Sequence, residues 1–311
     1  MKSMGKTKTY DEIQSDPDTN KIIKRIDKWN FWAMVLHLCS SAAIYILSNN
    51  PWKVYLTRAV TEWKPLHGKS GSCSDVPCFI GVTHVTVGSI SLEWMVVAFH
   101  FMSCLAHFFN WVCKDTYHVW LERKMNPGRW VEYFFSASLM QVVIQVLCGF
   151  YDIWTLTLCA VCIAVTQLFG HATEQFLHHS KGEQDPRENW QFYFFGWISF
   201  IVPWVGVYFN FYDSVFRSEP GPPTWVKYIV WTLFGAFASF AWVMYSFLKN
   251  YTDKNAMYTA ELRYIGLSLF AKTALAWQLF AGAFVRSSND LIAWDPSHAS
   301  TLLLQQTPGT G

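Results

Sequence analysis

Charged residues are scarce in this sequence. Asp, Glu, Lys and Arg make up 15% of its 311 residues, where roughly 25% is typical of soluble domains. Hydrophobic residues make up 52% and aromatic residues 18%. The net charge is only +2, and no basic stripe interleaves with aromatic residues as in nucleic-acid-binding proteins. The composition therefore argues against a soluble or nucleic-acid-binding protein and favours one polytopic membrane domain.

Cysteines in polar surroundings are also few. Six of the eight cysteines lie in or beside apolar stretches, where cysteine packs as a small hydrophobic residue. Cys159 and Cys162 form a C-x-x-C inside such a stretch without a second pair, so a metal or redox site is weakly indicated. Only Cys73 and Cys78 share a polar loop. On an oxidising outer face they can form a disulfide, and two free cysteines are the simple alternative.

Long apolar runs recur along the whole chain. Each is about 20 residues long, which suffices to cross a bilayer core of about 30 Å. The fold class that we predict is an all-α membrane protein, a seven-transmembrane-helix bundle over residues 29–285. Residues 1–28 are polar and lack the apolar core of a signal peptide, so they are interpreted as a cytosolic arm, and residues 286–311 as a flexible outer tail. The spans are placed at 29–48, 92–112, 130–149, 153–171, 190–212, 225–248 and 264–285.

Lys and Arg are distributed unequally between the two sides of this bundle. Sixteen lie in the N-terminal arm and the connections on its side, and six lie in the opposite connections. Because cytoplasmic segments carry the excess of positive charge, the N-terminus is expected in the cytoplasm. Seven crossings then place the C-terminus on the extracellular side.

The first outward connection, residues 49–91, is longer than an ordinary connector and is expected to have structure of its own. Its later part, residues 78–87, is rich in β-branched residues that loosely alternate with other types. This pattern predicts a small β-hairpin in the first extracellular loop.

Lys272 is a charge inside the last predicted span. An ionisable side chain costs roughly 2.5–3.5 kcal/mol at mid-depth in a membrane, and Lys272 is about 12 Å along the helix from Tyr264. One interpretation is a lysine paired with a carboxylate for packing alone. The other is an amine that forms a Schiff base with an aldehyde, since a desolvated lysine can act as a nucleophile. Ser268 is one turn earlier on the same face.

Glu132 is the best counter-charge for this lysine. Asn126 and Pro127 provide an N-cap and a first-turn proline for the third span, which places Glu132 about a turn and a half into the helix. Ser136 and Met140 continue its face. A glutamate that only supports the helix dipole is plausible but leaves Lys272 unexplained, so the two together suggest an ion pair.

Histidines add to the polar groups within the spans. His37 lies in the first span, and His100 and His107 lie in the second, with Ser103 one turn before His107. A lone buried histidine is more often a packed core residue than a proton carrier, and no repeated spacing indicates a metal site. A membrane enzyme is a further alternative, and the set closest to a catalytic group is His171, Glu174, His178 and His179.

Two segments resemble the heliorhodopsin family, and the similarity extends over nearly the whole chain. They are Arg129-Trp-Val-Glu-Tyr-Phe-Phe-Ser-Ala-Ser-Leu-Met140 and Tyr264-Ile-Gly-Leu-Ser-Leu-Phe-Ala-Lys272. The resemblance implies that Lys272 carries all-trans retinal as a protonated Schiff base and that Glu132 is its counterion. It also implies an inverted topology, which the charge count had predicted, and a homodimer.

The resemblance extends to further positions of the site. Ser268, Ser136 and Ser103 are implied to form a hydrogen-bond network, and His37 and His107 a polar cluster that manages the proton. Charged positions implied to line a cytoplasmic-side cavity are Arg129, Glu174 and Glu261. Looser matches for the retinal pocket wall are Met140, Trp204, Phe234 and Phe237.

The function implied is that of a light-sensing membrane photoreceptor, neither an enzyme nor a metalloprotein. Isomerisation of retinal would disturb the ion pair and drive a slow conformational signal, without net ion pumping, which a signalling partner could read. A light-gated proton or ion channel on the same fold is the alternative. The predicted spans 190–212 and 225–248 contain no carboxylate, which favours sensing.

Overall fold

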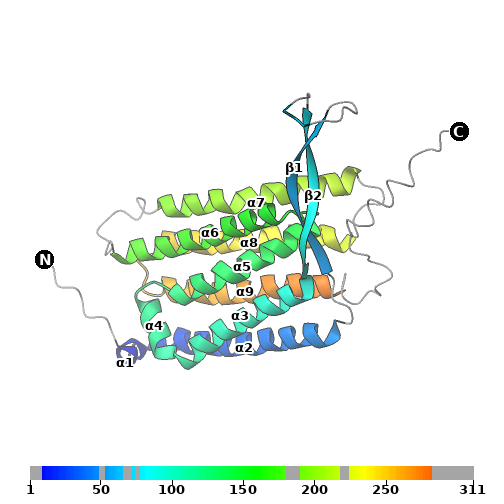
Figure 1. Ribbon diagram of the computed structural model, residues 1–311. Helices are drawn as coiled ribbons and strands as arrows, with labels where there is room; N and C mark the ends of the chain where they lie inside the picture. The colour runs from blue at the N-terminus through cyan, green and yellow to red at the C-terminus, as the bar shows by residue number, and fades with distance from the viewer. Residues whose placement is uncertain are drawn as a thin grey trace.

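The computed structural model describes residues 9–48, 53–65, 72–74, 78–179, 190–217 and 224–281. Long helices lie side by side in a bundle, and one two-stranded hairpin projects from one end of it (Figure 1). The elements in chain order are α1 (Tyr10–Gln14), α2 (Pro17–Leu47), β1 (Lys53–Pro65), β2 (Cys78–Ser91), α3 (Leu92–Val112), α4 (Lys114–Glu122), α5 (Pro127–Leu147), α6 (Ile153–His179), α7 (Trp190–Arg217), α8 (Thr224–Lys249) and α9 (Ala256–Leu279).

Six helices of the described chain are long and apolar enough to cross a membrane: α2, α3, α5, α6, α7 and α8. The protein is therefore a multi-pass integral membrane protein. The helix α9 has 24 residues and packs against α2 and α8. It is less apolar because it includes Glu261, Arg263 and Lys272.

Local sequence signals fix where several helices begin. The helix α5 begins at Pro127, and its N-cap Asn126 accepts a hydrogen bond from the amide of Arg129 at 3.1 Å. This confirms the start expected from Asn126 and Pro127, since proline at the first turn sacrifices no helical hydrogen bond. Asp16 and Pro17 give α2 the same kind of start.

The N-terminal arm differs from its prediction. Residues 17–28 form the first turns of α2, so the first membrane helix begins at Pro17 rather than at 29. Ile23 and Ile26 are fully buried, and their packing against the bundle stabilises this extension in spite of its polar composition. The short helix α1 precedes α2, and a capping box between Thr9 and Glu12 caps its N-terminus.

Other boundaries also move. The last helix begins at Ala256 instead of 264, and residues 282–285 of the predicted span lie outside the described residues, as does the predicted tail 286–311. The helix α4 was not predicted. It is short, and Tyr117, His118 and Leu121 are buried, so tertiary contacts rather than a long apolar run account for it.

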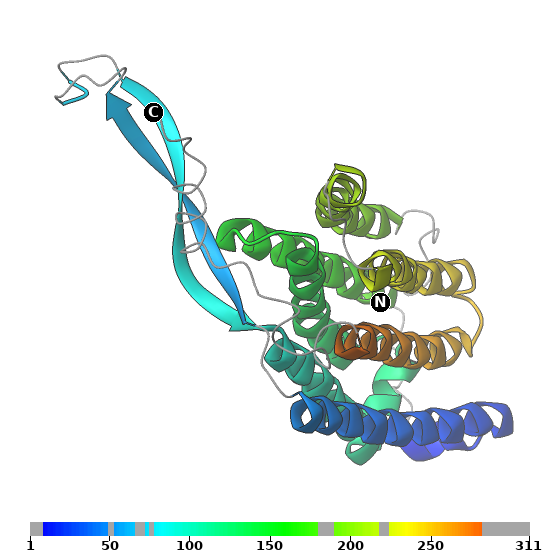
Figure 2. The ribbon, with the colours of Figure 1, turned by 90° about the vertical axis from the view of Figure 1, so that its right-hand side faces the viewer.

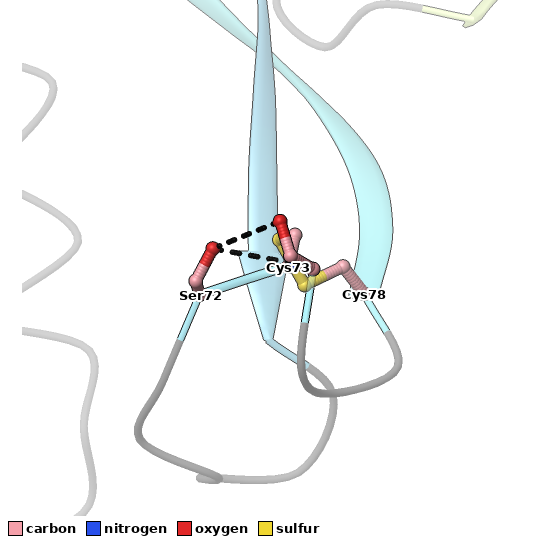
Figure 3. The surroundings of a disulfide bond; sticks show 4 residues. Ser72, Cys73 and Cys78 are labelled. Atoms are coloured by element: carbon pink, nitrogen blue, oxygen red, sulfur yellow. Dashed lines mark hydrogen bonds between the residues drawn. A yellow bond between two sulfur atoms is a disulfide. The ribbon is translucent and has the colours of Figure 1, made fainter.

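The hairpin is larger than the small one expected. The strands β1 and β2 pair along their whole length, from Lys53 opposite Ser91 to Pro65 opposite Cys78. The first strand was missed because charged and polar residues interrupt its alternation. Near the outer end of the hairpin, Cys73 and Cys78 form a disulfide (Figure 3).

The base of the hairpin is attached to the bundle, while its outer part stands away from it (Figure 2). Val54 and Leu56 are buried in the apolar core, and the amide of Thr57 donates to the carbonyl of Tyr151 at 2.8 Å. Two apolar clusters divide the bundle, one nearer the hairpin and one nearer α1 and α4. The polar residues of the site lie between and within these clusters.

Candidate functional site

Lys272 lies in the interior of the bundle and is 3% exposed. Its Nζ donates a hydrogen bond to Ser268 Oγ, one helical turn earlier, at 2.7 Å. The ring of Tyr133 on α5 lies 5.0 Å from the same nitrogen, within the range of a cation–π interaction. The apolar residues of α9 therefore enclose one positive group, and its partners come from α5 and from its own helix.

Glu132 reaches this lysine from α5. Its Oε1 is 3.0 Å from Lys272 Nζ and accepts a hydrogen bond from Ser103 Oγ on α3 at 2.7 Å. Ser136 is fully buried one turn further along α5. The structure thus brings together Lys272, Glu132, Ser103 and Ser268, four of the residues singled out in the sequence.

A buried ion pair of this kind is weak evidence for stability alone. Removing two charges from water costs several kcal/mol for each ion, and well-packed apolar residues often replace such pairs without loss. Breaking the pair by removing one partner is expensive, at about 3–5 kcal/mol. The geometry is therefore better explained by a chemical role for the lysine and its counter-charge.

Three histidines form a continuous group beside this pair. His37 Nδ1 lies 2.8 Å from His100 Nδ1, so one ring donates and the other accepts. The rings of His37 and His107 stack at 5.6 Å with an angle of 9° between their planes. His107 Nδ1 is also 2.8 Å from Asn30 Oδ1. His100, noted in the sequence without an assigned role, is therefore part of the cluster.

A cavity adjoins Lys272. Helices α5, α6, α7, α8 and α9 all contribute to its wall, which is mostly apolar and aromatic. Met140 and Phe237 line it, as expected of a pocket wall. Trp204 and Phe234 are not among the residues that line it, and the Trp204 ring packs 5.7 Å from Phe237 and 5.3 Å from Phe234.

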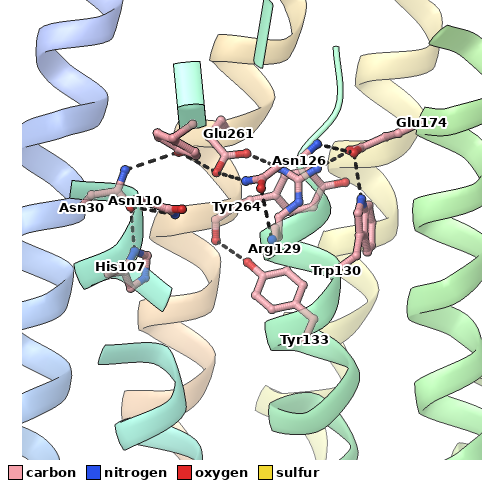
Figure 4. A network of polar contacts seen from close by, with 11 residues as sticks. Asn30, His107, Asn110, Asn126, Arg129, Trp130, Tyr133, Glu174, Glu261 and Tyr264 are labelled. Atoms are coloured by element: carbon pink, nitrogen blue, oxygen red, sulfur yellow. Dashed lines mark hydrogen bonds and ion pairs between the residues drawn. The ribbon is translucent and has the colours of Figure 1, made fainter. Parts of the chain in front are cut away.

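Arg129, Glu174 and Glu261 form a second buried network nearer α4 (Figure 4). Arg129 pairs with both carboxylates, and the three residues are 5%, 1% and 2% exposed. Asn126 donates its backbone amide to Glu174 and its side-chain amide to Glu261, both at 2.8 Å. Trp130 Nε1 also donates to Glu174 at 2.8 Å. The resemblance implied that the three charged residues line a cavity; here they pack against one another.

Tyr117 connects this network to the histidines. Its hydroxyl donates to Glu261 Oε1 at 2.8 Å and accepts from Asn30 Nδ2 at 3.3 Å. Burial, reinforced by the nearby Glu261 carboxylate, holds the pKa of the Tyr117 phenol well above its usual range, so the hydroxyl keeps its proton. Because Asn30 also contacts His107, polar side chains run without a break from His107 to Glu174 (Figure 4).

Three of the residues considered for a membrane enzyme, Glu174, His178 and His179, have other partners. Glu174 is held in the Arg129 network. His178 and His179 are hydrogen-bonded to the backbone carbonyls of Arg123 and Gln175, at 3.1 and 2.7 Å. The part of the chain that the structure describes contains no group of three His, Cys, Asp or Glu side chains placed to hold a metal ion.

Sequence reasoning missed Tyr133, Asn30, Tyr117 and Trp130 as members of the polar site. A signal existed for Asn30, because it precedes His37 by seven residues and so shares its helix face. Tyr117 lies outside every predicted span, and nothing local distinguishes it from an interfacial tyrosine. Tyr133 and Trp130 read as ordinary aromatic residues of an apolar helix.

The family model described as Heliorhodopsin matches residues 26–284 of the chain. This chain belongs to the heliorhodopsin family. It is therefore a retinal-binding rhodopsin of the membrane, and Lys272 is a buried lysine that lines the apolar cavity of this heliorhodopsin. No curated protein matches it in sequence.

Solved structures support the fold. The transmembrane domain of the Salpingoeca rosetta rhodopsin phosphodiesterase aligns with a TM-score of 0.56 at 10% identity, over 86% of this chain and 88% of that one. A light-driven proton pump from Leptosphaeria maculans aligns with a TM-score of 0.54 at 12% identity, over 83% of this chain and 95% of that one. At such identities the likeness concerns the fold alone, so neither enzymatic activity nor pumping follows from it.

Proposed function

We propose that this heliorhodopsin is a light-sensing photoreceptor that carries all-trans retinal on Lys272, with Glu132 as the counterion. The observation that carries the proposal is the contact of 3.0 Å between Lys272 Nζ and Glu132 Oε1 beside a cavity lined by aromatic residues. The amine has access to the cavity, and its counter-charge lies on the opposite helix.

The residues present fit such a group. The cavity wall is apolar and aromatic, as an extended polyene requires, and it includes Tyr193, Trp197 and Phe240 as well as Met140 and Phe237. Retinal attached at Lys272 supplies light absorption and isomerisation. The chain supplies the enclosure, the counter-charge and the routes for a proton.

Each polar neighbour of Lys272 has a task in this proposal. Glu132 stabilises a positive nitrogen at Lys272, and Ser103 holds the carboxylate in place by donating to it. Ser268 keeps the Lys272 nitrogen on the side of α9 that faces Glu132. His37 and His107 offer nearby ring nitrogens for a displaced proton, and Ser136 lies on the same face of α5 as Glu132.

A sensor is favoured over a pump by the position of the carboxylates. A pump needs a donor and an acceptor on opposite sides of the lysine. Glu174 and Glu261 both lie on the α4 side, bound to Arg129, and the buried Glu93 at the hairpin end of α3 accepts a hydrogen bond from Ser91. Movement at Lys272 can instead spread through His107, Asn30 and Tyr117 to α4, where a signalling partner would detect a slow change of shape.

The orientation and assembly belong to the same proposal. We place α9 as the seventh membrane span, the N-terminus in the cytoplasm and the C-terminus outside, because sixteen Lys and Arg lie on the N-terminal side and six on the other. The hairpin then lies on the outer side. We expect a homodimer in the plasma membrane or another cellular membrane.

The decisive experiment is pigment formation. Purified protein mixed with all-trans retinal should become coloured, Lys272→Ala should stay colourless, and Lys249→Ala should colour like the wild type. Lys249 is a suitable control because it is exposed at the end of α8. A colourless wild type, or a coloured Lys272→Ala protein, contradicts the proposal.

A light-gated proton or ion channel is the second candidate. It is favoured by the buried histidine group next to the lysine, because linked polar side chains within a membrane mark routes for protons. Voltage clamp of cells that express the protein separates the two functions. A sensor gives no steady photocurrent, whereas a channel gives a current that reverses with voltage.

A further inference from the structure

The cytoplasmic extension of α2 has an unusual distribution of charge. Lys21, Lys24, Arg25 and Lys28 are all exposed, and counted from Lys21 they occupy positions i, i+3, i+4 and i+7. Side chains at these positions lie on one face of a helix. The opposite face carries Ile23 and Ile26, which are fully buried against the bundle. The four basic residues, named here the basic stripe, therefore point away from the protein.

The basic stripe continues directly into a membrane-facing apolar stripe. From Lys28, steps of four and three residues lead to Trp32, Leu36 and Cys39, which are all exposed on the side of α2 away from the bundle. Because α2 is one unbroken helix from Pro17 to Leu47, the two stripes form a single line. A lipid whose acyl chains lie against Leu36 and Trp32 has its headgroup beside the basic stripe.

Distances along the helix agree with this arrangement. Lys28 and Arg25 lie about 6 and 10 Å from Trp32 along the helix axis, at 1.5 Å per residue. Exposed tryptophans mark the membrane–water interface, and the headgroup layer is about 5–8 Å thick on each side of the core. Lys28 is thus level with the headgroups, the long side chains of Arg25 and Lys24 reach back into that layer, and Lys21 lies just beyond it.

Among the residues that the structure describes, no ion pair neutralises the positive charge of the stripe. Two nearby acidic residues have other partners, because Asp27 contacts His118 at 2.7 Å and Asp16 contacts Lys254 at 2.6 Å. A third, Asp18, is exposed three residues before Lys21.

We propose that the basic stripe of α2 is a binding site for anionic phospholipid headgroups, which selects such lipids for the shell around the first membrane helix. A lysine or arginine at an anionic membrane surface gives about fivefold tighter binding. Four such residues on one line recognise charge rather than a particular headgroup structure. The site is independent of retinal and of the reaction at Lys272.

Spin-labelled lipids test this directly. The full-length protein is reconstituted in phosphatidylcholine bilayers that contain a trace of spin-labelled phosphatidylserine or spin-labelled phosphatidylcholine, and the motionally restricted fraction is measured by electron paramagnetic resonance. The wild type should restrict phosphatidylserine severalfold more strongly than phosphatidylcholine. About 1 M salt, which shortens the screening length to about 3 Å, should reduce this preference.

Variants test whether the basic stripe causes the preference for phosphatidylserine. The change K21Q/K24Q/R25Q/K28Q should bring the ratio of the two lipids close to one, while K53Q/R58Q/K64Q, which removes three exposed charges from the hairpin, should leave it unchanged. The milder K21Q/K24Q should give an intermediate ratio and serves if the fourfold variant fails to insert. Equal restriction of both lipids by the wild type overturns the proposal, as does a preference that survives in K21Q/K24Q/R25Q/K28Q.

Discussion

Gly170 is the residue whose size is most tightly constrained in the site. A Cβ at this position of α6 would lie 2.3 Å from two ring carbons of Trp130. Trp130 is held against α6 by its hydrogen bond to Glu174, one turn after Gly170 on the same helix, and both Trp130 and Gly170 line the cavity next to Lys272. The absence of a side chain at 170 therefore lets α5 and α6 approach with an indole between them.

We expect Gly170→Ala to displace Trp130 and break its bond to Glu174. Overpacking of this kind costs about 1–3 kcal/mol, so the thermal unfolding midpoint of the purified protein should fall. Gly235→Ala in α8 is the matched control, because nothing lies within 4 Å of its added Cβ. There the higher helix propensity of alanine, worth up to about 1 kcal/mol, should leave the midpoint unchanged or raise it. Equal effects of the two changes would argue against the packing explanation.

At the scale of single residues, the sequence identifies buried charged residues more readily than packing contacts. Lys272 and Glu132 were found because a charge in an apolar helix needs a reason, and the structure places them in contact. Gly170 and Trp130 carry no such signal, since glycine and tryptophan are common in membrane helices. Only the packing of α5 on α6 shows that these two residues depend on each other.

At the scale of elements, the start of α2 is fastened to the connection between α8 and α9. Asp16, the N-cap of α2, accepts a hydrogen bond from Lys254 Nζ at 2.6 Å and from Thr19 Oγ1 at 2.8 Å. The bond from Lys254, followed by that from Thr19, lowers the pKa of the Asp16 carboxyl. The same contact raises the pKa of Lys254.

This attachment should depend on pH in one direction. Because the folded pKa of Asp16 lies below the unfolded value of about 3.9, its stabilising effect is present above about pH 4. That effect is lost as the pH falls through the folded value. We expect Asp16→Asn to lower the unfolding midpoint slightly at pH 6, and its difference from the wild type to shrink as the pH falls through the folded pKa of Asp16.

The variant Lys254→Gln tests whether Lys254 is the partner through which Asp16 stabilises the fold. It should remove the same pH-dependent difference, and the double variant Asp16→Asn/Lys254→Gln should be no less stable than either single variant. Additive losses would show that the two side chains act separately.

Elements with a strong periodic pattern were predicted well, and those that depend on distant contacts were not. The start of α5 followed from Asn126 and Pro127. Residues 17–28 looked like a polar arm, and only the burial of Ile23 and Ile26 against the bundle makes them helical. The strand β1 is likewise defined by its pairing with β2, which a single strand pattern cannot show.

For the whole molecule, the inequality of positive charge is the strongest argument for orientation. A tag at the N-terminus should bind antibody only after cells are permeabilised, whereas a tag between β1 and β2 should bind on intact cells. This follows from the excess of Lys and Arg on the N-terminal side. Access to the N-terminal tag on intact cells, with the hairpin tag hidden, would reverse the assignment.

The continuity of α2 has a mechanical consequence. Its 31 residues form a rod about 46 Å long, half as long again as the bilayer core of about 30 Å. His37 belongs to the group of three histidines, and Pro17 lies about 30 Å away along the rod. A tilt of about 5° around His37 therefore swings the Pro17 end through about 3 Å at that radius. The helix is a lever arm, and a fluorescent reporter fused ahead of it would convert a small motion near the lysine into a measurable displacement.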